Sequence, residues 1–188
     1  MTNSELWLVR HGETEWSRTG QHTGRTDLPL TEKGRDEART AARALNGVAF
    51  DSVVVSPLAR ARETCEIVGF GARARIEPDA MEWDYGDLNG LTRAEIKAVH
   101  GEGWSIWRGP VPGGESLDEV AERARRVLAG LAEGRTAIFA HGHFLRILTA
   151  VYLGMQPAAA RHFALATARI SILGEDYGHP AILRWNAG

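Results

Sequence analysis

The sequence predicts an α/β fold, a three-layer sandwich in which a mostly parallel sheet lies between two layers of helices. Short apolar runs, such as Leu6–Val9 and Thr136–Ala140, alternate with helix-like segments along the whole chain. Such runs are typical of strands buried on both faces, and strands that alternate with helices form largely parallel sheets. No repeat, linker or low-complexity segment interrupts the pattern, so residues 1–188 are predicted to form a single domain.

The first 70 residues are predicted to contain two strand–helix units. The expected elements are a strand at 6–9, a loop at 12–30, a helix at 31–46, a strand at 53–55 and a helix at 56–68. Thr31 is a typical N-cap and Gly47 a typical helix stop. Ser56-Pro57 has the pattern of an N-cap followed by the first helical residue, so the second helix is predicted to begin there.

The rest of the chain continues the alternation around two irregular segments. The expected elements are a short strand at 73–77, an irregular segment at 78–90, a helix at 92–99, a loop or lid at 101–114, a helix at 116–131, a strand at 136–140, a helix at 144–153, and strands at 168–173 and 181–185. Ser116 and Glu119 have the spacing of a capping box, which places the start of the long helix. The last two strands are candidate edge strands for a homodimer.

Composition excludes several classes of protein. The chain of 20.5 kDa has a net charge of −2, which argues against a nucleic-acid or membrane surface built on bulk charge. Its single cysteine, Cys65, allows neither an internal disulfide nor a four-cysteine zinc site, and mid-helix it is predicted to be a small buried filler. The start lacks a secretory signal, and the apolar stretch Ile147–Met155 is too short to span a bilayer, so a cytoplasmic protein is expected.

Chemistry-bearing residues follow three of the predicted strands. Parallel α/β sheets bind ligands beyond the carboxyl ends of their strands. Arg10-His11-Gly12, the Ser56–Arg60 segment and His141-Gly142 stand at these ends. We therefore expect them to converge on one crevice, although more than a hundred residues separate the first from the last.

The residue types in this crevice indicate phosphoryl transfer. A cation beside His11 disfavours the imidazolium and keeps the ring a neutral nucleophile. Arginines balance the charge of the phosphoryl oxygens, and Glu82, set among aromatic residues, is a candidate proton donor. Arg60, one turn into its helix, is predicted to bend back over the crevice, whereas Arg62 is predicted to face solvent. The chain has no Walker lysine motif and no aspartate cluster for Mg²⁺, so no metal or other cofactor is expected.

The same residues resemble the signature of the histidine phosphatase superfamily, which includes cofactor-dependent phosphoglycerate mutases and many phosphatases. The segments that carry the resemblance are 8–14 (LVRHGET), 20–34 (GQHTGRTDLPLTEKG), 56–64 (SPLARARET), 82–90 (EWDYGDLNG), 112–116 (PGGES) and 141–146 (HGHFLR). They span nearly the whole chain in the order of the family, and they imply a phosphoglycerate mutase-like fold.

The resemblance also implies a role for each matching residue. His11 would be the phosphorylated nucleophile, and Glu82 the proton donor and later the base for the attacking water. The residues that would bind the phosphoryl group are Arg10, Arg60 and His141, with Ser17, Thr23, Gly24 and Gly142 completing the phosphate pocket. Many mutases carry an asparagine where Ser17 stands.

Two departures from the mutases favour a phosphatase of small phosphorylated metabolites, such as sugar phosphates or bisphosphates. The family's mutases hold the substrate carboxylate with paired arginines in the interval where this chain has Trp104-Ser105-Ile106-Trp107-Arg108, a segment without an arginine pair. After Glu82, Trp83-Asp84 replaces the Arg-His typical of mutases. The segments around 20–31 and 82–86 are instead similar to those of sugar-bisphosphatase and acid-phosphatase members.

Alternative interpretations remain open at this point. The chain could be a phosphoglycerate mutase, or a catalytically silent domain that binds phosphate for regulation. The histidines at 11, 22, 141 and 143 offer a zinc-site alternative, against which His143 would cap the helix or face the substrate. Trp104 and Trp107 are either core anchors or a lid over the substrate. The cluster Arg123, Arg125 and Arg126 is predicted to lie on a solvated helix face.

Overall fold

The computed structural model of the protein describes residues 4–188 and has a six-stranded sheet in the order β3-β2-β4-β1-β5-β6. The strands are β1 (Glu5–Arg10), β2 (Ser52–Val55), β3 (Arg75–Ile76), β4 (Arg135–Ala140), β5 (Ile170–Asp176) and β6 (His179–Ala187). β3, β2, β4 and β1 pair in parallel, whereas β5 and β6 form an antiparallel extension at one edge. This confirms the predicted mostly parallel sheet.

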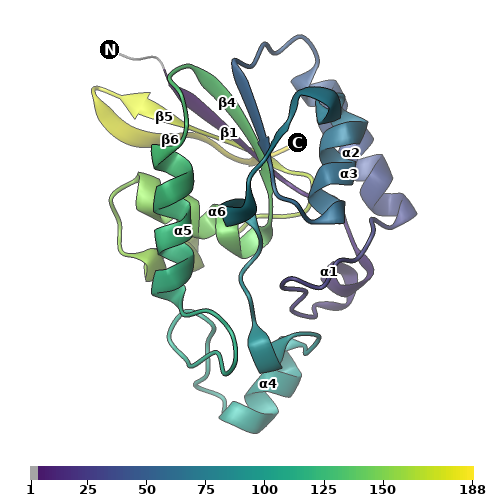
Figure 1. Cartoon of the computed structure of the whole chain (residues 1–188). Helices are drawn as coiled ribbons and strands as arrows, with labels where there is room; N and C mark the ends of the chain where they lie inside the picture. Colours follow the sequence, from purple (N-terminus) through teal and green to yellow (C-terminus); the bar gives the residue numbers. More distant parts are fainter. Residues whose placement is uncertain (1–3) are drawn as a thin grey trace.

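Helices cover both faces of the sheet, as predicted. The α-helices are α1 (Glu15–Thr19), α2 (Glu32–Leu45), α3 (Ala59–Val68), α4 (Arg93–His100), α5 (Leu117–Ala129) and α6 (Gly142–Tyr152). Figure 1 shows α5 and α6 on one side of the sheet and α2 and α3 on the other. Short 3₁₀ helices at 71–73, 78–80, 86–88 and 157–162 complete the connections.

Strand side chains divide between two hydrophobic cores. Leu8 of β1 and Ile138 of β4 belong to the core under α5 and α6, and their neighbours Val9 and Phe139 to the core under α2 and α3. All four side chains are fully buried. Both faces of these strands are covered, which explains why the sequence shows continuous apolar runs rather than alternation.

The prediction was wrong at two helix starts. The segment 12–30, expected to be loop throughout, contains the five-residue helix α1, which begins with a capping box between Thr14 and Ser17. The third helix begins at Ala59 with Leu58 as its N-cap, not at Ser56-Pro57. The Ser56 N–H instead bonds the Phe139 carbonyl at the end of β4, so the chain continues as strand-like backbone for longer than the Ser-Pro pattern suggests.

A smaller group of elements lies beyond the carboxyl ends of the strands. α4 and the segments that flank it extend below the sheet in Figure 1. The 101–114 segment has neither helix nor strand, as predicted, and it packs back on the chain at Gly86, which has a φ of +49°. A Cβ there would lie 2.2 Å from the Pro112 carbonyl oxygen, so this turn accepts only glycine.

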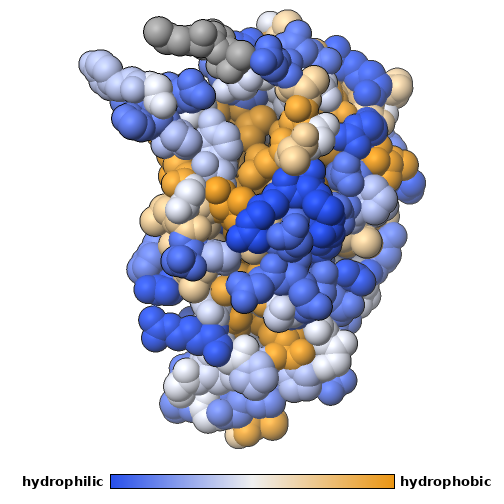
Figure 2. Space-filling view, turned by 60° about the vertical axis from the view of Figure 1, so that its left-hand side comes forward, coloured by the Kyte–Doolittle hydropathy of each residue, from blue (hydrophilic) through white to orange (hydrophobic). Residues whose placement is uncertain are grey.

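The surface is polar over most of the face in Figure 2, with hydrophobic side chains in small groups between hydrophilic ones. Among the helices formed within residues 4–188, none has the length and apolar character needed to cross a membrane.

Candidate active site

The predicted convergence of the strand ends is confirmed by the structure. Arg10 at the end of β1 stands in register with Ala140 at the end of β4, so the next residues, His11 and His141, meet. Their ring centroids are 5.2 Å apart, and both side chains are at most 5% exposed. Parallel pairing of two strands distant in sequence therefore brings the two His-Gly pairs together.

His11 is held as a neutral imidazole with one nitrogen free of the backbone. Its Nδ1 lies 2.7 Å from the Gly12 carbonyl oxygen, a distance at which Nδ1–H donates a hydrogen bond. The proton on Nδ1 leaves the Nε2 lone pair available. Burial, followed by the charges of Arg60 and Arg10, lowers the pKa of His11 well below its ordinary value of 6.5. Such a ring is a nucleophile at neutral pH.

Arg60 places a buried positive charge against that nucleophile. Its side chain is inaccessible to solvent, and its Nη atoms donate to the carbonyls of Thr26 and Gly24 at 2.9 and 2.7 Å. Its Nε donates to Nε2 of His11 at 3.3 Å. Gly24, expected in the phosphate pocket, thus accepts a hydrogen bond from the Arg60 guanidinium through its backbone carbonyl. Arg62 is exposed, as predicted.

Arg10 supplies a second, partly buried positive charge, and Gly142 leaves the space for it. A Cβ at Gly142 would lie 3.2 Å from Nε and 3.3 Å from Cζ of Arg10. The guanidinium donates through Nη1 to the Leu165 carbonyl, whereas its buried Nε has no hydrogen-bond partner among the described residues. Because a buried donor without a partner is costly, Nε is a group that an anionic ligand would satisfy.

His141 lies beneath the site and is fully buried. Its Nε2 is 2.7 Å from the hydroxyl of Ser56, and its Nδ1 has no partner among residues 4–188. Burial lowers its pKa well below 6.5, with Arg60 as the next cause. Ser56, predicted to cap a helix at one of the converging strand ends, therefore orients the second histidine.

Glu82 sits at the amino end of α6. Its carboxylate accepts hydrogen bonds from the backbone N–H groups of His143 and Phe144 at 3.1 and 2.9 Å. These are donors that the first turn of a helix leaves free. The carboxyl group is thereby fixed beside the His141-Gly142 turn, on the side of the site where the predicted proton donor is needed.

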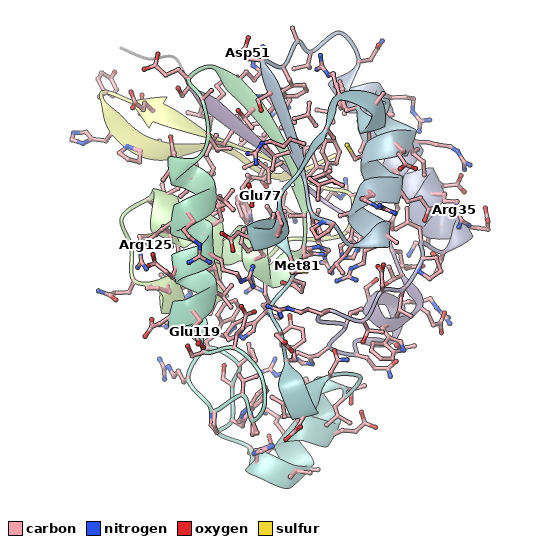
Figure 3. All side chains as sticks on the ribbon, in the orientation of Figure 1. Arg35, Asp51, Glu77, Met81, Glu119 and Arg125 are labelled. Carbon is pink, nitrogen blue, oxygen red and sulfur yellow. The ribbon has the colours of Figure 1, made fainter. Side chains whose placement is uncertain are left out.

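Arg123 holds the segment that carries Glu82, and its predicted place on a solvated face was wrong. It is 6% exposed and donates to the carbonyls of Asp79 and Met81 at 2.6 and 2.9 Å. It also pairs with the Glu115 carboxylate at 2.8 Å. Arg125 and Arg126, on the same helix, are exposed as predicted (Figure 3 labels Arg125).

A cavity of about 230 Å³ opens over these groups. Among the predicted site residues, those that line it are Arg10, His11, Ser17, Thr23, Arg60, Glu82 and Gly142. The Ser17 hydroxyl already donates to the Thr14 carbonyl within the α1 capping box. His141 and Gly24 are not among the residues that line the cavity.

The other lining residues had no firm role in the sequence analysis; those with a titratable side chain are His22, Tyr85, His143 and Arg146. The Tyr85 hydroxyl bonds Nδ1 of His143, and the rings of His22 and His143 stack with centroids 6.2 Å apart. Burial lowers the pKa of both histidines. The position of His143 two residues after His141 was the available signal, and facing the substrate was one of the two roles considered for it.

The histidines do not form a metal centre in the described part of the chain. Residues 4–188 contain no group of three or more His, Cys, Asp or Glu side chains placed to hold a metal ion. One ring nitrogen of each of three histidines is engaged by the protein: Nδ1 of His11 by Gly12, Nε2 of His141 by Ser56 and Nδ1 of His22 by Leu91.

Comparison with known proteins places these residues in a family. The model of the histidine phosphatase superfamily (branch 1) matches residues 6–188. An acid phosphatase of Mycobacterium tuberculosis is 36% identical over 182 residues, which cover 94% of this chain and 89% of the relative. A 2,3-bisphosphoglycerate-dependent phosphoglycerate mutase of Parvibaculum lavamentivorans is 43% identical over 76% of this chain and 77% of the relative. The solved structure of a mycobacterial glucosyl-3-phosphoglycerate phosphatase in complex with VO3 matches with a TM-score of 0.88 and 29% identity, over 98% of this chain and 99% of that chain.

Proposed function

Because the chain belongs to the histidine phosphatase superfamily, we propose that it hydrolyses phosphomonoesters of small metabolites through a phosphohistidine on His11. The observation that carries the proposal is the buried His11, whose pKa is lowered and whose Nε2 accepts a hydrogen bond from Arg60. The guanidinium groups of Arg60 and of the neighbouring Arg10 are both held by backbone carbonyls, which leave their positive charge for a ligand. A nucleophile beside fixed positive charges suits attack on a phosphoryl group, whose oxygens carry the charge of the transition state.

The first half-reaction transfers the phosphoryl group to the enzyme. Nε2 of His11 attacks phosphorus, the bond from phosphorus to the ester oxygen breaks, and protonated Glu82 gives its proton to the departing alcohol. Arg10, Arg60 and His141 stabilise the negative charge on the phosphoryl oxygens. Nδ1 of His141 is buried and has no hydrogen-bond partner among residues 4–188, so a phosphoryl oxygen would supply this nitrogen with a partner.

The second half-reaction releases phosphate. Glu82, now a carboxylate, accepts a proton from water as the water oxygen attacks the phosphohistidine. The nitrogen–phosphorus bond breaks, the neutral imidazole returns, and Glu82 is again protonated. The backbone donors from α6 keep the same carboxyl oxygens in place for both steps.

Water is the proposed acceptor because the chain lacks the arginines with which the family's mutases hold a carboxylate. Trp83, at the position after Glu82, is fully buried and its indole N–H donates to the Glu115 carbonyl. This residue therefore supports the core instead of a substrate. A mutase is the second candidate, favoured by the 43% identity to a phosphoglycerate mutase. A silent phosphate-binding domain is less favoured, because the nucleophile, both arginines and the second histidine all stand in the site.

The test is release of inorganic phosphate in the presence of a chelator, from an aryl phosphate, sugar mono- and bisphosphates and 3-phosphoglycerate. We expect release by the wild type, loss with His11→Ala, and no change with His179→Ala, which removes an exposed histidine from β6. Release that survives His11→Ala would overturn the mechanism. Isomerisation of 3-phosphoglycerate without net release would establish the mutase, and binding without turnover the silent domain.

A further inference from the structure

Thr64 is a fully buried polar residue that takes no part in the chemical steps and does not line the cavity. It lies on α3, one turn beyond Arg60. Its hydroxyl donates to the Arg60 carbonyl at 2.7 Å and accepts from the Gly12 N–H at 3.1 Å. The two bonds join the helix that carries Arg60 to the turn that follows the nucleophile, across 52 residues of sequence.

The chemistry of the groups fixes the direction of both bonds. A threonine hydroxyl has one proton, and the Arg60 carbonyl, which can only accept, takes it. The lone pairs of Oγ1 are left for a donor, and the backbone N–H of Gly12 fills that role. A threonine that bonds the carbonyl four residues earlier is an ordinary feature of helices, so the bond from Gly12 is what sets Thr64 apart.

This bond is part of the support of the His11 backbone. The His11 N–H donates to the Ala140 carbonyl at 3.0 Å, and the His11 carbonyl accepts from the Ala168 N–H at 3.1 Å. Within residues 4–188, the bond to Thr64 is the only one that ties the backbone of His11 or Gly12 to a side chain outside this pair. The conformation at Gly12 also directs its own carbonyl, which accepts from Nδ1 of His11. The tautomer of the imidazole therefore depends on how Gly12 is held.

We propose that Thr64 is a positioning residue that keeps the His11 ring in its Nδ1–H tautomer and in register with Arg60. The inference rests on the proposed function, in which Nε2 of His11 attacks phosphorus. In the structure Nδ1–H donates to the Gly12 carbonyl at 2.7 Å, and Nε2 accepts from Nε of Arg60 at 3.3 Å. Removal of the Thr64 hydroxyl leaves the buried Gly12 N–H without a partner, so the turn gains a reason to rotate toward another acceptor. Rotation gives access to the Nε2–H tautomer, which has no lone pair on Nε2 for the attack.

The ring nitrogens of His11 report the tautomer directly. In ¹⁵N-labelled protein at about pH 7.5, correlation spectra distinguish a protonated from an unprotonated ring nitrogen. His11→Ala identifies the signals of His11 among those of the seven histidines. We expect the Nδ1–H form in the wild type. Thr64→Val, which keeps the shape of the side chain without the hydroxyl, should move the two ¹⁵N shifts of His11 toward each other, and Thr64→Ser should leave them as in the wild type.

Thr149→Val is the matched control. Thr149 on α6 is equally buried, and its hydroxyl donates to the Leu145 carbonyl at 2.8 Å but accepts from no donor in the described chain. This variant should leave the His11 shifts unchanged. With an aryl phosphate, Thr64→Val should lower kcat per folded enzyme by about 10–10² and change KM less than about threefold, because the nucleophile is misplaced while the phosphate site persists. Thr64→Ser and Thr149→Val should keep kcat within about threefold of the wild type.

His11 shifts that stay in place in Thr64→Val, or that move equally in Thr149→Val, would overturn the inference, as would a loss of kcat in Thr64→Ser as large as that in Thr64→Val. If Thr64→Val does not fold, Thr64→Ala takes its place, because it removes the same hydroxyl without adding a methyl group. A failure of the proposed function has a different outcome. A wild type that releases no phosphate refutes hydrolysis, while the ¹⁵N shifts still decide whether Thr64 sets the tautomer of His11.

Discussion

Nε of Arg60 donates a hydrogen bond to Nε2 of His11 over 3.3 Å, joining the start of α3 to the end of β1 across 49 residues of sequence. The contact fixes the direction of the nucleophilic lone pair before any substrate is present. It also places the guanidinium beside the position that the oxygens of a phosphoryl group on Nε2 would occupy. Orientation and charge stabilisation therefore come from one side chain.

Arg60→Lys is expected to lower kcat by about 10²–10³, the cost of losing one aligned donor to a developing anion. A lysine keeps the charge but cannot donate at once to Gly24, Thr26 and His11 as the arginine does. Steady-state kinetics with an aryl phosphate measure the loss. The matched variant is Arg62→Lys on the same helix, whose exposed side chain lies outside the cavity. Similar rates for Arg60→Lys and Arg62→Lys would refute the role of Arg60.

Glu82→Gln should separate substrates by their leaving groups. An alkoxide needs a proton as its bond to phosphorus breaks, whereas an aryl oxide leaves without one. We expect a loss of about 10²–10⁴ in kcat/KM for a sugar phosphate and a much smaller loss for an aryl phosphate. The glutamine oxygen can still accept from the Phe144 N–H, but the glutamine NH2 cannot accept from the His143 N–H, so circular dichroism and the melting temperature serve as the control for folding. Equal losses on both substrates would show that Glu82 does not protonate the leaving group.

The convergence of the residues at the strand ends could be predicted from the sequence, because it follows from the pairing of the strands alone. Once the runs ending at Val9 and Ala140 are parallel neighbours, His11 and His141 must share one edge of the sheet. Arg60 could also be predicted to face the crevice from its closeness in sequence to the end of β2, although the helix that carries it begins at Ala59 and not at Ser56. These positions depend on local periodicity and on a general property of parallel sheets.

The rest of the site depends on tertiary contacts that no local pattern contains. Ser-Pro is the same dipeptide whether Ser56 caps a helix or, as here, ends a strand and bonds His141. Helical periodicity puts Arg123 on the face of the buried Val120 and Val127, but the carbonyls that accept from its guanidinium come from the 79–82 segment, which no local pattern places against α5. A second cavity, lined by Arg93, Trp107 and Arg161 among others, joins α4, the 104–107 segment and the turn after α6, whose relative placement is set by long-range packing.

Gly142→Ala should weaken phosphate binding more than it weakens the fold. A Cβ at this position would lie 3.2 Å from Nε of Arg10, which is closer than ordinary contact and forces the guanidinium to shift by a few tenths of an ångström. We expect KM for phosphomonoesters, and the inhibition constant for inorganic phosphate, to rise severalfold. The matched variant is Gly103→Ala, where an added Cβ meets no atom within 4 Å and the backbone does not have a positive φ. An unchanged inhibition constant in Gly142→Ala would contradict the role assigned to this contact.

Stability should fall as the pH is lowered below about 6.5. The pKa values of His11, His141 and His143 are lowered by burial in the folded protein, so below their ordinary value of 6.5 the unfolded chain binds protons that the folded chain does not. Each such histidine contributes up to about 1.4 kcal/mol of lost stability per pH unit. Urea unfolding between pH 7.5 and 5.5 measures this slope above the range where carboxylates titrate.

The His11→Ala variant tests whether the buried imidazoles cause the pH dependence of stability. His11→Ala removes one of the buried imidazoles, so its unfolding free energy should depend less steeply on pH than that of the wild type. A free energy of unfolding that stays constant from pH 7.5 to 5.5 in the wild-type protein would contradict neutral burial of these rings.

Arg123→Ala is expected to destabilise the protein and to impair Glu82, although Arg123 is absent from the cavity lining. The substitution leaves the carbonyls of Asp79 and Met81 without their donor, and it leaves the Glu115 carboxylate, whose side chain is 16% exposed, with Arg25 at 3.2 Å in place of two cationic partners. Breaking a buried ion pair on one side costs about 3 kcal/mol. Arg125→Ala, which removes an exposed pair with Glu122, should change stability by less than about 0.5 kcal/mol.

The kinetic signature distinguishes positioning of Glu82 from stability alone. If Arg123 positions the proton donor, the folded fraction of Arg123→Ala should lose more activity on a sugar phosphate than on an aryl phosphate, as Glu82→Gln does. Arg123→Lys, which restores the charge and one donor, should recover part of that difference. A variant that is merely less stable would lose activity on both substrates in proportion to its folded fraction. Both activities would then recover at a low assay temperature, where more of the protein is folded.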